Sequence, residues 1–354
     1  YSAARGFGND DAAFLAAEGF TAVRLGIDFR GLMPTPGAID ENYIDGIADS
    51  VTVLGNHGIF VLLDFHQDGF APKYNGNGLT DWMAIDDGLA NPPDAVFPLY
   101  YIQNPAMQRA FEHFWDDSPV PAGLGVQTYF LQGVARIVAR FANDPMVLGT
   151  ELMNEPWPGA DWTGCIAAGV GCPGLEAERL APFNRRGAAV VHALAPDQLV
   201  FVEPFVLFNF GQGPTSLPGP DPGFALSFHS YALTLAGEEA VAQLGAAAAI
   251  RDGAPAAVTE FGATGDPAVL SRLAGQFDAN LLPWMFWSYD EQIVRNEALP
   301  PSGDNLRGVA LAALVRPYPI ATTGVPTALA YDPATRTLDF AYTTENLELL
   351  QKGM

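Results

Sequence analysis

Short apolar runs typical of buried strands alternate with longer amphipathic segments over most of this 354-residue chain. An unbroken apolar run predicts a strand covered on both faces, and alternation with helices predicts a parallel sheet with right-handed crossovers. The predicted strands span 21–27, 59–65, 147–153, 199–203, 224–229, 256–260 and 283–287. The predicted helices lie near 11–18, 43–56, 126–142, 176–194, 236–251, 267–279 and 305–315. The chain is therefore expected to be an α/β protein.

Seven strands at this spacing predict a (β/α)8 TIM barrel, with a catalytic domain over 1–316. Since 11–18 reads as the first helix, we expect the remaining strand upstream of residue 1. After residue 316, alternating tracts at 328–331 and 337–342 predict a β-hairpin. We expect 317–354 to begin a small C-terminal β-sandwich-like domain, although its final ten residues do not fit that pattern.

The charge balance excludes several classes of partner. Seventeen basic and 40 acidic residues give a net charge of −23, while 49% of the residues are hydrophobic. An acidic chain lacks the cations that neutralise nucleic-acid phosphates or dock on anionic lipids, and this much apolar material argues against disorder. No apolar run reaches the roughly 18 residues of a membrane span, so stable membrane insertion is not expected. The first residues do not read as a signal peptide.

The two cysteines, Cys165 and Cys172, lie close together in a glycine-rich stretch. They can form a disulfide in an exported protein, or remain two reduced thiols in a loop. Their closeness, with no third cysteine present, favours the disulfide. Two cysteines without a nearby histidine pair supply too few ligands for zinc, and no P-loop or His-Glu-x-x-His motif is present, so no metal or cofactor is expected.

Polar side chains follow almost every predicted strand. In a parallel α/β barrel the carboxyl ends of the strands meet at one face, where the active site forms. The polar groups at these ends are Arg24, Asp64, His66, Asp68, Asn154, Glu155, Glu203, His229, Tyr231, Thr259, Glu260 and Trp287. Such convergence predicts one catalytic pocket.

Two glutamates in this set, Glu155 and Glu260, end the strands that we count as the fourth and seventh of the barrel. A single glutamate after a strand is more often a salt-bridge partner at the rim. Two of them can cleave a glycosidic bond with retention, one as nucleophile and one as acid/base, when about 5–5.5 Å separates them.

These residues carry a resemblance to a known family. The strings Asn154-Glu155-Pro156 and Thr259-Glu260-Phe261-Gly262, with an aromatic strand ending at Trp287, resemble the clan-A retaining glycoside hydrolases of family 5. The longer strings at 151–159, 66–68 and 287–291 are similar to its endoglycoceramidase branch, which includes endogalactosylceramidases. The resemblance covers roughly residues 6–343, and it implies a retaining enzyme that releases an oligosaccharide from ceramide.

The resemblance also implies catalytic roles. Glu155 would be the acid/base and Glu260 the nucleophile. Asn154 would hydrogen-bond the sugar 2-hydroxyl, a contact that strengthens in the transition state. Tyr231 would hold the carboxylate of the nucleophile, and His229 would help to set the protonation of the pair.

Further positions follow from the same resemblance. Arg24 would support the nucleophile and keep it ionised through its fixed charge. His66 and Asp68 would bind hydroxyls of the sugar next to the cleaved bond, and Trp287 would form the floor beneath that sugar. Trp115 would add a further sugar contact.

Two apolar segments, Ala95–Tyr101 and Phe205–Phe210, fall where loops are expected to be wet. They can form a trough for the hydrocarbon chains of ceramide, or pack long loops onto the barrel. A polysaccharide-cleaving relative such as a β-glucanase is the alternative enzyme, and a non-catalytic glycolipid- or carbohydrate-binding barrel is the alternative of another class. We expect a secreted monomer whose partner is a glycosphingolipid, reached with the help of detergent or an activator protein.

Overall fold

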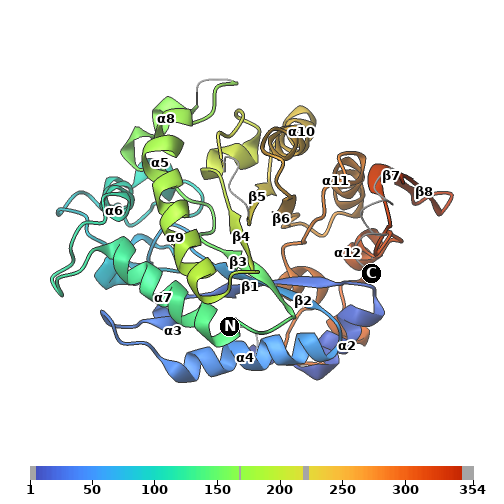
Figure 1. The fold of residues 1–354 in the computed structure, drawn as a ribbon, viewed down its shortest axis with the longest axis horizontal. Helices are drawn as coiled ribbons and strands as arrows, with labels where there is room; N and C mark the ends of the chain where they lie inside the picture. The colour runs from blue at the N-terminus through green and yellow to red at the C-terminus, as the bar shows by residue number, and fades with distance from the viewer. Residues whose placement is uncertain (1–4, 167–168, 218–222, 345–354) are drawn as a thin grey trace.

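The computed structural model describes residues 5–166, 169–217 and 223–344, and its centre is a curled parallel sheet flanked by helices (Figure 1). The sheet contains β1 (Ala22–Ile27), β2 (Phe60–Phe65), β3 (Val147–Glu151), β4 (Leu199–Val202), β5 (Phe224–Ser230) and β6 (Ala256–Phe261). Every strand pairs in parallel with its neighbour in chain order. This is the arrangement of a (β/α)8 barrel, as predicted.

Each of the seven predicted helical segments contains a helix. The helices are α2 (Asn9–Ala17), α3 (Phe29–Leu32), α4 (Glu41–Asn56), α5 (Tyr100–Gln103), α6 (Pro105–Trp115), α7 (Val126–Phe141), α8 (Pro173–Leu175), α9 (Ala181–Leu194), α10 (Leu235–Asp252), α11 (Pro267–Ala279) and α12 (Gly308–Leu314). Of these, α3, α5, α6 and α8 are further helices that were not predicted. Local capping sets several starts. Asp266 accepts hydrogen bonds from the backbone N–H groups of Ala268 and Val269, and Pro267 occupies the first helical position of α11.

The last predicted strand, at 283–287, is not a continuous strand. Its ends form parallel bridges with β6, Trp284 opposite Val258 and Trp287 opposite Gly262. Between these bridges β6 contains one residue more than the 284–287 segment, so a bulge interrupts the ladder and breaks the strand into two bridges. The segment still extends the sheet beyond β6. Among the described residues, no strand pairs with the outer edge of β1.

Aromatic side chains fill the space between the sheet and its helices. Phe29 stacks on Phe130 with ring centroids 4.7 Å apart, beneath β1 and β2. On the other side, α10 approaches β5 closely at Gly245, where a Cβ atom would lie 2.2 Å from the ring of Phe228. Side-chain volume therefore limits this contact to glycine.

The predicted C-terminal hairpin is present as β7 (Val325–Asp332) and β8 (Thr337–Thr343), which pair antiparallel. The guanidinium of Arg316 lies 5.1 Å from the ring centroid of Tyr331, which ties the hairpin to the chain leaving α12. A β-sandwich-like domain built on this hairpin stays a prediction, and the tail at 345–354 lies outside the described residues. Among those described, no helix has the length and apolarity needed to cross a membrane.

Candidate active site

The polar residues predicted at the strand ends come together at one end of the sheet. Arg24 lies on β1, His66 follows β2, Asn154 and Glu155 follow β3, and His229 and Glu260 lie on β5 and β6. Most are buried, with Glu155 and Glu260 each 7% exposed and His229 fully covered. Buried polar groups need partners, and these side chains find them in one another.

A bulge in β6 aims two consecutive side chains into this group. Phe228 pairs with Val258, but His229 pairs with Glu260, so Thr259 is the extra residue. A bulge disrupts strict alternation, and here both neighbours point inward. Thr259 donates to Glu151 at 3.0 Å, and Glu260 accepts from Arg24 at 2.9 Å.

Glu155 stands in a left-handed backbone conformation, with φ of 41°. This region is unfavourable for a residue with a side chain and persists only where the surroundings hold it. The Gln67 side-chain amide donates to the carbonyls of Asn154 and Glu155 at 2.8 and 2.9 Å, while the Asn154 amide donates to the carbonyl of Gln67 at 2.8 Å. On the other side, a carboxyl oxygen of Glu203 accepts the N–H of Glu155 at 3.2 Å.

The carboxyl group of Glu155 has two polar neighbours. His229 Nδ1 lies 2.8 Å from Glu155 Oε1, and the Asn209 amide donates to the same oxygen at 3.0 Å. The side-chain oxygen of Asn209, Oδ1, also accepts the backbone N–H of His229 at 3.0 Å. Asn209 thus fixes both the glutamate and the histidine that contacts it.

The carboxyl group of Glu260 is held from three sides. The Tyr231 hydroxyl donates to Oε1 at 2.8 Å, and Arg24 Nη1 donates to Oε2 at 2.9 Å. His229 Nε2 lies 3.7 Å from Oε2. Because Nδ1 of the same ring faces Glu155, a single imidazole lies between the two glutamates.

Arg24 is the cation at the centre of this group. Its guanidinium pairs with Glu151, Asp64, Glu203 and Glu260, and Nη2 donates to Asn154 Oδ1 at 2.7 Å. Burial alone would lower the pKa of Arg24, but these carboxylates hold it well above its ordinary value. The predicted support of Glu260 by Arg24 is therefore one part of a larger network.

Burial and charge oppose each other at the neighbouring titratable groups. Burial raises the pKa of Glu260 above its usual range, while His229 and Arg24 counteract that rise. Burial raises the pKa of Glu203 to about 8. Burial would lower the pKa of His229, but the charges of Glu203 and Glu260 and its hydrogen bonds outweigh this and raise the value well above normal.

Three of the predicted sugar-binding residues, His66, Asp68 and Trp287, line a cavity of about 500 Å³ between β1 and the 284–287 segment. His66 contacts Asp64 at 2.8 Å and Asp68 at 3.3 Å, and its ring is parallel to that of Trp287 with centroids 5.3 Å apart. Trp287 is 38% exposed, so its ring remains available to a ligand. Arg24 also lines the cavity and connects it to Glu260.

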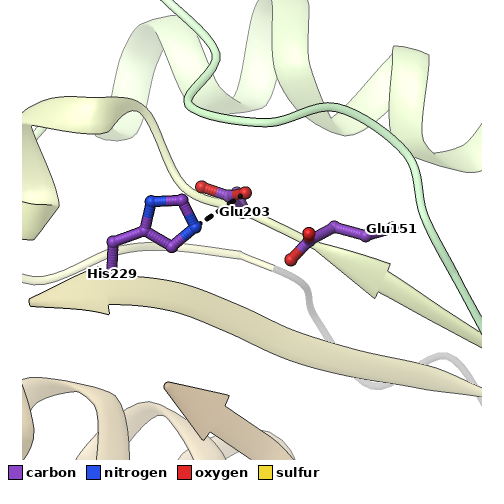
Figure 2. A group of neighbouring side chains, drawn as sticks. All are labelled: Glu151, Glu203 and His229. Carbon is purple, nitrogen blue, oxygen red and sulfur yellow. Dashed lines mark ion pairs between the residues drawn. The ribbon is translucent and has the colours of Figure 1, made fainter. Parts of the chain in front are cut away.

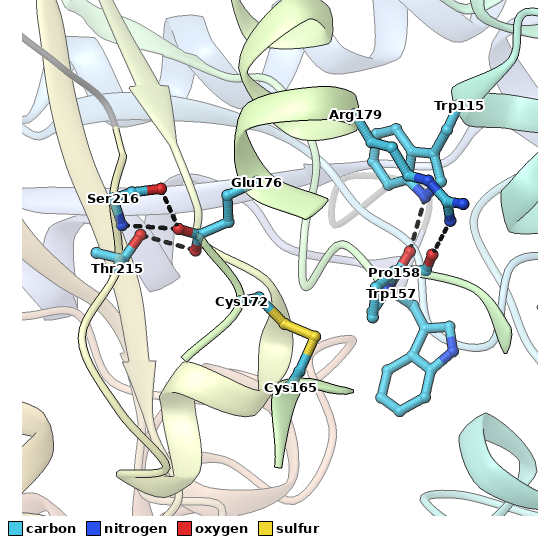
Figure 3. The surroundings of a disulfide bond; sticks show 9 residues. All are labelled: Trp115, Trp157, Pro158, Cys165, Cys172, Glu176, Arg179, Thr215 and Ser216. Carbon is cyan, nitrogen blue, oxygen red and sulfur yellow. Dashed lines mark hydrogen bonds between the residues drawn. A yellow bond between two sulfur atoms is a disulfide. The ribbon is translucent and has the colours of Figure 1, made fainter. Parts of the chain in front are cut away.

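Trp115 packs the loop after β3 onto the barrel. Its side chain is 8% exposed, and its indole N–H donates to the carbonyl of Trp157 at 2.9 Å (Figure 3). Its ring packs edge-on against Phe183 and Phe205. The sugar contact of Trp115 stays a prediction.

Cys165 and Cys172 form a disulfide in the loop that follows β3 (Figure 3). Beside it, Glu176 accepts hydrogen bonds from Thr215 Oγ1 at 2.8 Å and from the backbone N–H of Ser216 at 2.7 Å. These contacts join the loops after β3 and β4 into one layer.

Glu151, Glu203 and His229 place ligand atoms within 4.8 Å of one another (Figure 2). Such spacing could hold a metal ion, but Arg24 pairs with both glutamates and Thr259 donates to Glu151. The two ring nitrogens of His229 also face carboxyl oxygens, Nδ1 that of Glu155 at 2.8 Å and Nε2 that of Glu203 at 3.3 Å. The donor set therefore fits an arginine-centred ion-pair network better than a metal site.

Among the buried residues of the network without a role assigned from the sequence are Gln67, Glu151, Glu203 and Asn209. Glu203 was placed at the predicted pocket with the other strand-end groups, and Gln67 and Glu151 lie within the strings that carry the family resemblance. Asn209 is the single polar residue in the apolar segment 205–210, and this isolated polar side chain could have indicated a role in the site. Gln67 acts through loop contacts that no sequence pattern indicates.

Comparisons with known proteins agree with this geometry. Residues 7–292 match the cellulase family, glycosyl hydrolase family 5. Endoglycoceramidase I of Rhodococcus hoagii (strain 103S) is 30% identical over 359 residues, covering 94% of this chain and 68% of the relative.

Two solved structures of endo-glycoceramidase II from Rhodococcus sp. are also similar. The lactosyl-enzyme intermediate has a TM-score of 0.78 at 26% identity, and the ganglioside GM3 complex has a TM-score of 0.78 at 27% identity. Each comparison covers 93% of this chain and 80% of the other.

Proposed function

Since the chain belongs to glycosyl hydrolase family 5 and to its endoglycoceramidases, we propose that it hydrolyses the bond between the oligosaccharide and ceramide of glycosphingolipids with retention. The observation that carries the proposal is the pair of buried glutamates, Glu155 and Glu260, on either side of the His229 ring. Similar proteins support it, because one was solved as a lactosyl-enzyme intermediate and also with a ganglioside bound.

In the first step the Glu260 carboxylate attacks the anomeric carbon of the sugar joined to ceramide. The bond from that carbon to the ceramide oxygen breaks, and Glu155 gives its proton to the departing oxygen. In the second step Glu155 takes a proton from water, whose oxygen displaces Glu260 from the anomeric carbon. Two inversions leave the product with its original configuration.

The contacts of Glu260 suit a nucleophile. Tyr231 donates to one carboxyl oxygen and Arg24 to the other. These donors aim the carboxylate and favour its charged form against the burial that raises its pKa.

The contacts of Glu155 suit a residue that changes protonation. Asn209 and His229 both address Oε1, and the second oxygen, Oε2, has no hydrogen-bond partner among the described residues. This leaves Oε2 as the atom that would carry the transferred proton. Asn154, positioned by Arg24 and Gln67, would hydrogen-bond the sugar 2-hydroxyl.

The cavity beside β1 would receive the sugar. Carboxylates and imidazolium groups bind hydroxyls well, so Asp68 and His66 would hold hydroxyls of the sugar next to the cleaved bond. The half-exposed ring of Trp287 would lie beneath that sugar.

The direct test is to incubate the protein with a glycosphingolipid in detergent and to measure free ceramide and released glycan by mass spectrometry. We expect both products in equal amounts, with Glu155→Gln slower by about 10²–10⁴-fold and Glu260→Gln inactive. Glu238→Gln is the matched control, because Glu238 is also a buried glutamate but pairs with Arg272 away from the site. Turnover of cello-oligosaccharides without ceramide release would favour the β-glucanase alternative, and binding without turnover would favour a non-catalytic barrel.

The nucleophile can be identified separately. An activated 2-deoxy-2-fluoro glycoside should leave its sugar on the protein, and peptide mapping should place the added mass on Glu260. Labelling of any other residue would refute the assignment.

We also propose that the protein acts outside the cell. The Cys165–Cys172 disulfide supports this, because such bonds persist in oxidising compartments. Expression of the full natural gene in its own host, followed by assay of medium and cell extract, tests it. Activity confined to the cell extract would contradict it.

A further inference from the structure

The two apolar segments noted in the sequence differ in their exposure: one is buried and the other is largely exposed. In the segment 205–210, Phe205, Val206 and Phe208 are buried at 2%, 4% and 5% exposure, so this segment packs the loop onto the barrel. In the segment 95–101 and the adjoining Ile102, four apolar side chains are exposed. Val96, Phe97, Leu99 and Ile102 are 53%, 63%, 47% and 44% exposed. Four exposed apolar residues within seven positions differ from the single ones that every protein surface carries.

This exposed patch, Val96–Ile102, lies against the active site. Between its outward side chains, Tyr100 and Tyr101 point inward and are buried. The Tyr101 hydroxyl accepts the backbone N–H of Gly69, next to Asp68, at 3.0 Å, and its ring lies 5.0 Å from that of Trp157, two residues beyond Glu155. The patch is therefore anchored to the two loops that carry Asp68 and Glu155.

Other loops at the carboxyl ends of the strands also expose apolar side chains. The disulfide loop exposes Ile166 (46%) and Val170 (54%), and the backbone N–H of Gly169 donates to the carbonyl of Gln212 at 3.0 Å in the loop after β4. That loop reaches the one after β5, because a Cβ atom on Gly211 would lie 3.0 Å from the carbonyl of Gly237.

The loop after β5 completes this edge. Leu233 and Leu235 are 92% and 58% exposed, and they follow Tyr231, which contacts the nucleophile. All these loops leave the carboxyl ends of strands, so they share one face of the barrel.

From this surface we propose that the Val96–Ile102 patch, with the adjoining apolar loops, seats the enzyme on the surface of a zwitterionic lipid bilayer with the pocket facing the lipid. The proposal rests on the proposed function, since a lipid-anchored substrate presents its sugar at such a surface. Residues 95–103 carry no charge, while the chain as a whole carries −23. An uncharged apolar tip enters the headgroup region, and a strongly acidic protein is repelled by anionic lipids.

The test compares Phe97→Ser with Ile250→Ser, a matched control that removes an 83% exposed apolar residue at the end of α10. We measure sedimentation with phosphatidylcholine vesicles, cleavage of a glycosphingolipid embedded in them, and hydrolysis of a water-soluble aryl glycoside. Phe97→Ser should weaken vesicle binding and vesicle cleavage by between about tenfold and a hundredfold, the effect of one buried phenylalanine side chain. The aryl glycoside rate should change less than about twofold, as should every rate of Ile250→Ser.

Other outcomes overturn the proposal. These are no binding of the unchanged enzyme to phosphatidylcholine, tighter binding when phosphatidylserine is added, or equal losses for Phe97→Ser and Ile250→Ser. A parallel loss on the aryl glycoside would show that the loop shapes the pocket instead. If Phe97→Ser does not fold, Phe97→Cys carrying an environment-sensitive dye decides the matter, since an unchanged emission on vesicles refutes insertion.

The proposed function can fail independently of this surface. An enzyme that binds vesicles but releases no ceramide in detergent would refute the proposed substrate and leave the lipid contact standing. Ceramide release in detergent without vesicle binding would support the proposed substrate and refute the lipid contact.

Discussion

Replacing Asn209 by alanine isolates the contribution of one hydrogen bond to the proposed acid/base. Its side-chain amide nitrogen donates to Glu155 Oε1 at 3.0 Å, and its side-chain Oδ1 accepts the backbone N–H of His229 at 3.0 Å. Hydrogen bonds to charged groups contribute about 1.5–3 kcal/mol, and an unsatisfied buried N–H costs about 1–3 kcal/mol. Asn209→Ala should therefore slow acid-assisted bond cleavage by roughly 10–150-fold and also lower the free energy of unfolding by about 1–3 kcal/mol.

The leaving group decides whether this reasoning is right. A dinitrophenyl group departs without a proton, whereas an alkyl alcohol such as ceramide needs one. Measured as kcat/KM, Asn209→Ala should be slow on an alkyl glycoside and nearly normal on a dinitrophenyl glycoside. Tyr231→Phe is the matched comparison: it removes one hydrogen bond to Glu260 and should slow both substrates alike, because both need the nucleophile.

Equal losses of Asn209→Ala on the two substrates would refute a role through Glu155. Normal rates on both, with the expected loss of stability, would show that Asn209 serves the fold alone.

Three other predictions concern stability and packing. Because the pKa of Glu203 is raised to about 8, the stability it contributes is complete below its ordinary value near 4.5 and is lost as the pH rises through 8. Urea unfolding should show the advantage of the unchanged protein over Glu203→Gln shrinking by up to about 1.4 kcal/mol per pH unit between pH 5 and 8, and parallel curves would contradict this. Replacing Cys165 and Cys172 by serine should lower the free energy of unfolding by about 2–3 kcal/mol, since the closed loop is short, and an unchanged midpoint would argue against the disulfide. Trp115→Phe removes the hydrogen bond to Trp157 and should lower the free energy of unfolding by about 1 kcal/mol, while KM for soluble glycosides stays unchanged. A raised KM would support the predicted sugar contact of Trp115.

The spacing of apolar residues along the chain predicted most of the strands and helices. Six of the seven predicted strands and all seven predicted helical segments are present, because hydrophobic pattern and caps act locally, as Asp266 and Pro267 do at α11. The strand predicted at 283–287 is reduced to two bridges, because a bulge in its partner strand interrupts the pairing. No local sequence pattern marks that bulge.

Some features of the site were predictable from the sequence, and others only from the tertiary structure. Glu155, Glu260, Arg24, His229 and Tyr231 stand in recognisable positions at strand ends, and the structure brings them into contact. The motifs could not show that Trp115 is covered while Phe97 is exposed, because burial depends on which loops lie above a side chain.

The sequence by itself therefore determined the barrel, the acidic apolar character of the chain and the two glutamates, since these depend on residue type and short-range spacing. Only the tertiary structure decided that Thr259 and Glu260 both face inward, that one imidazole lies between the glutamates, and that Asn209 and Glu203 hold Glu155. The physical reason is that register, bulges and hydrogen bonds join segments distant along the chain. A one-residue change in pairing reverses the direction in which a side chain points.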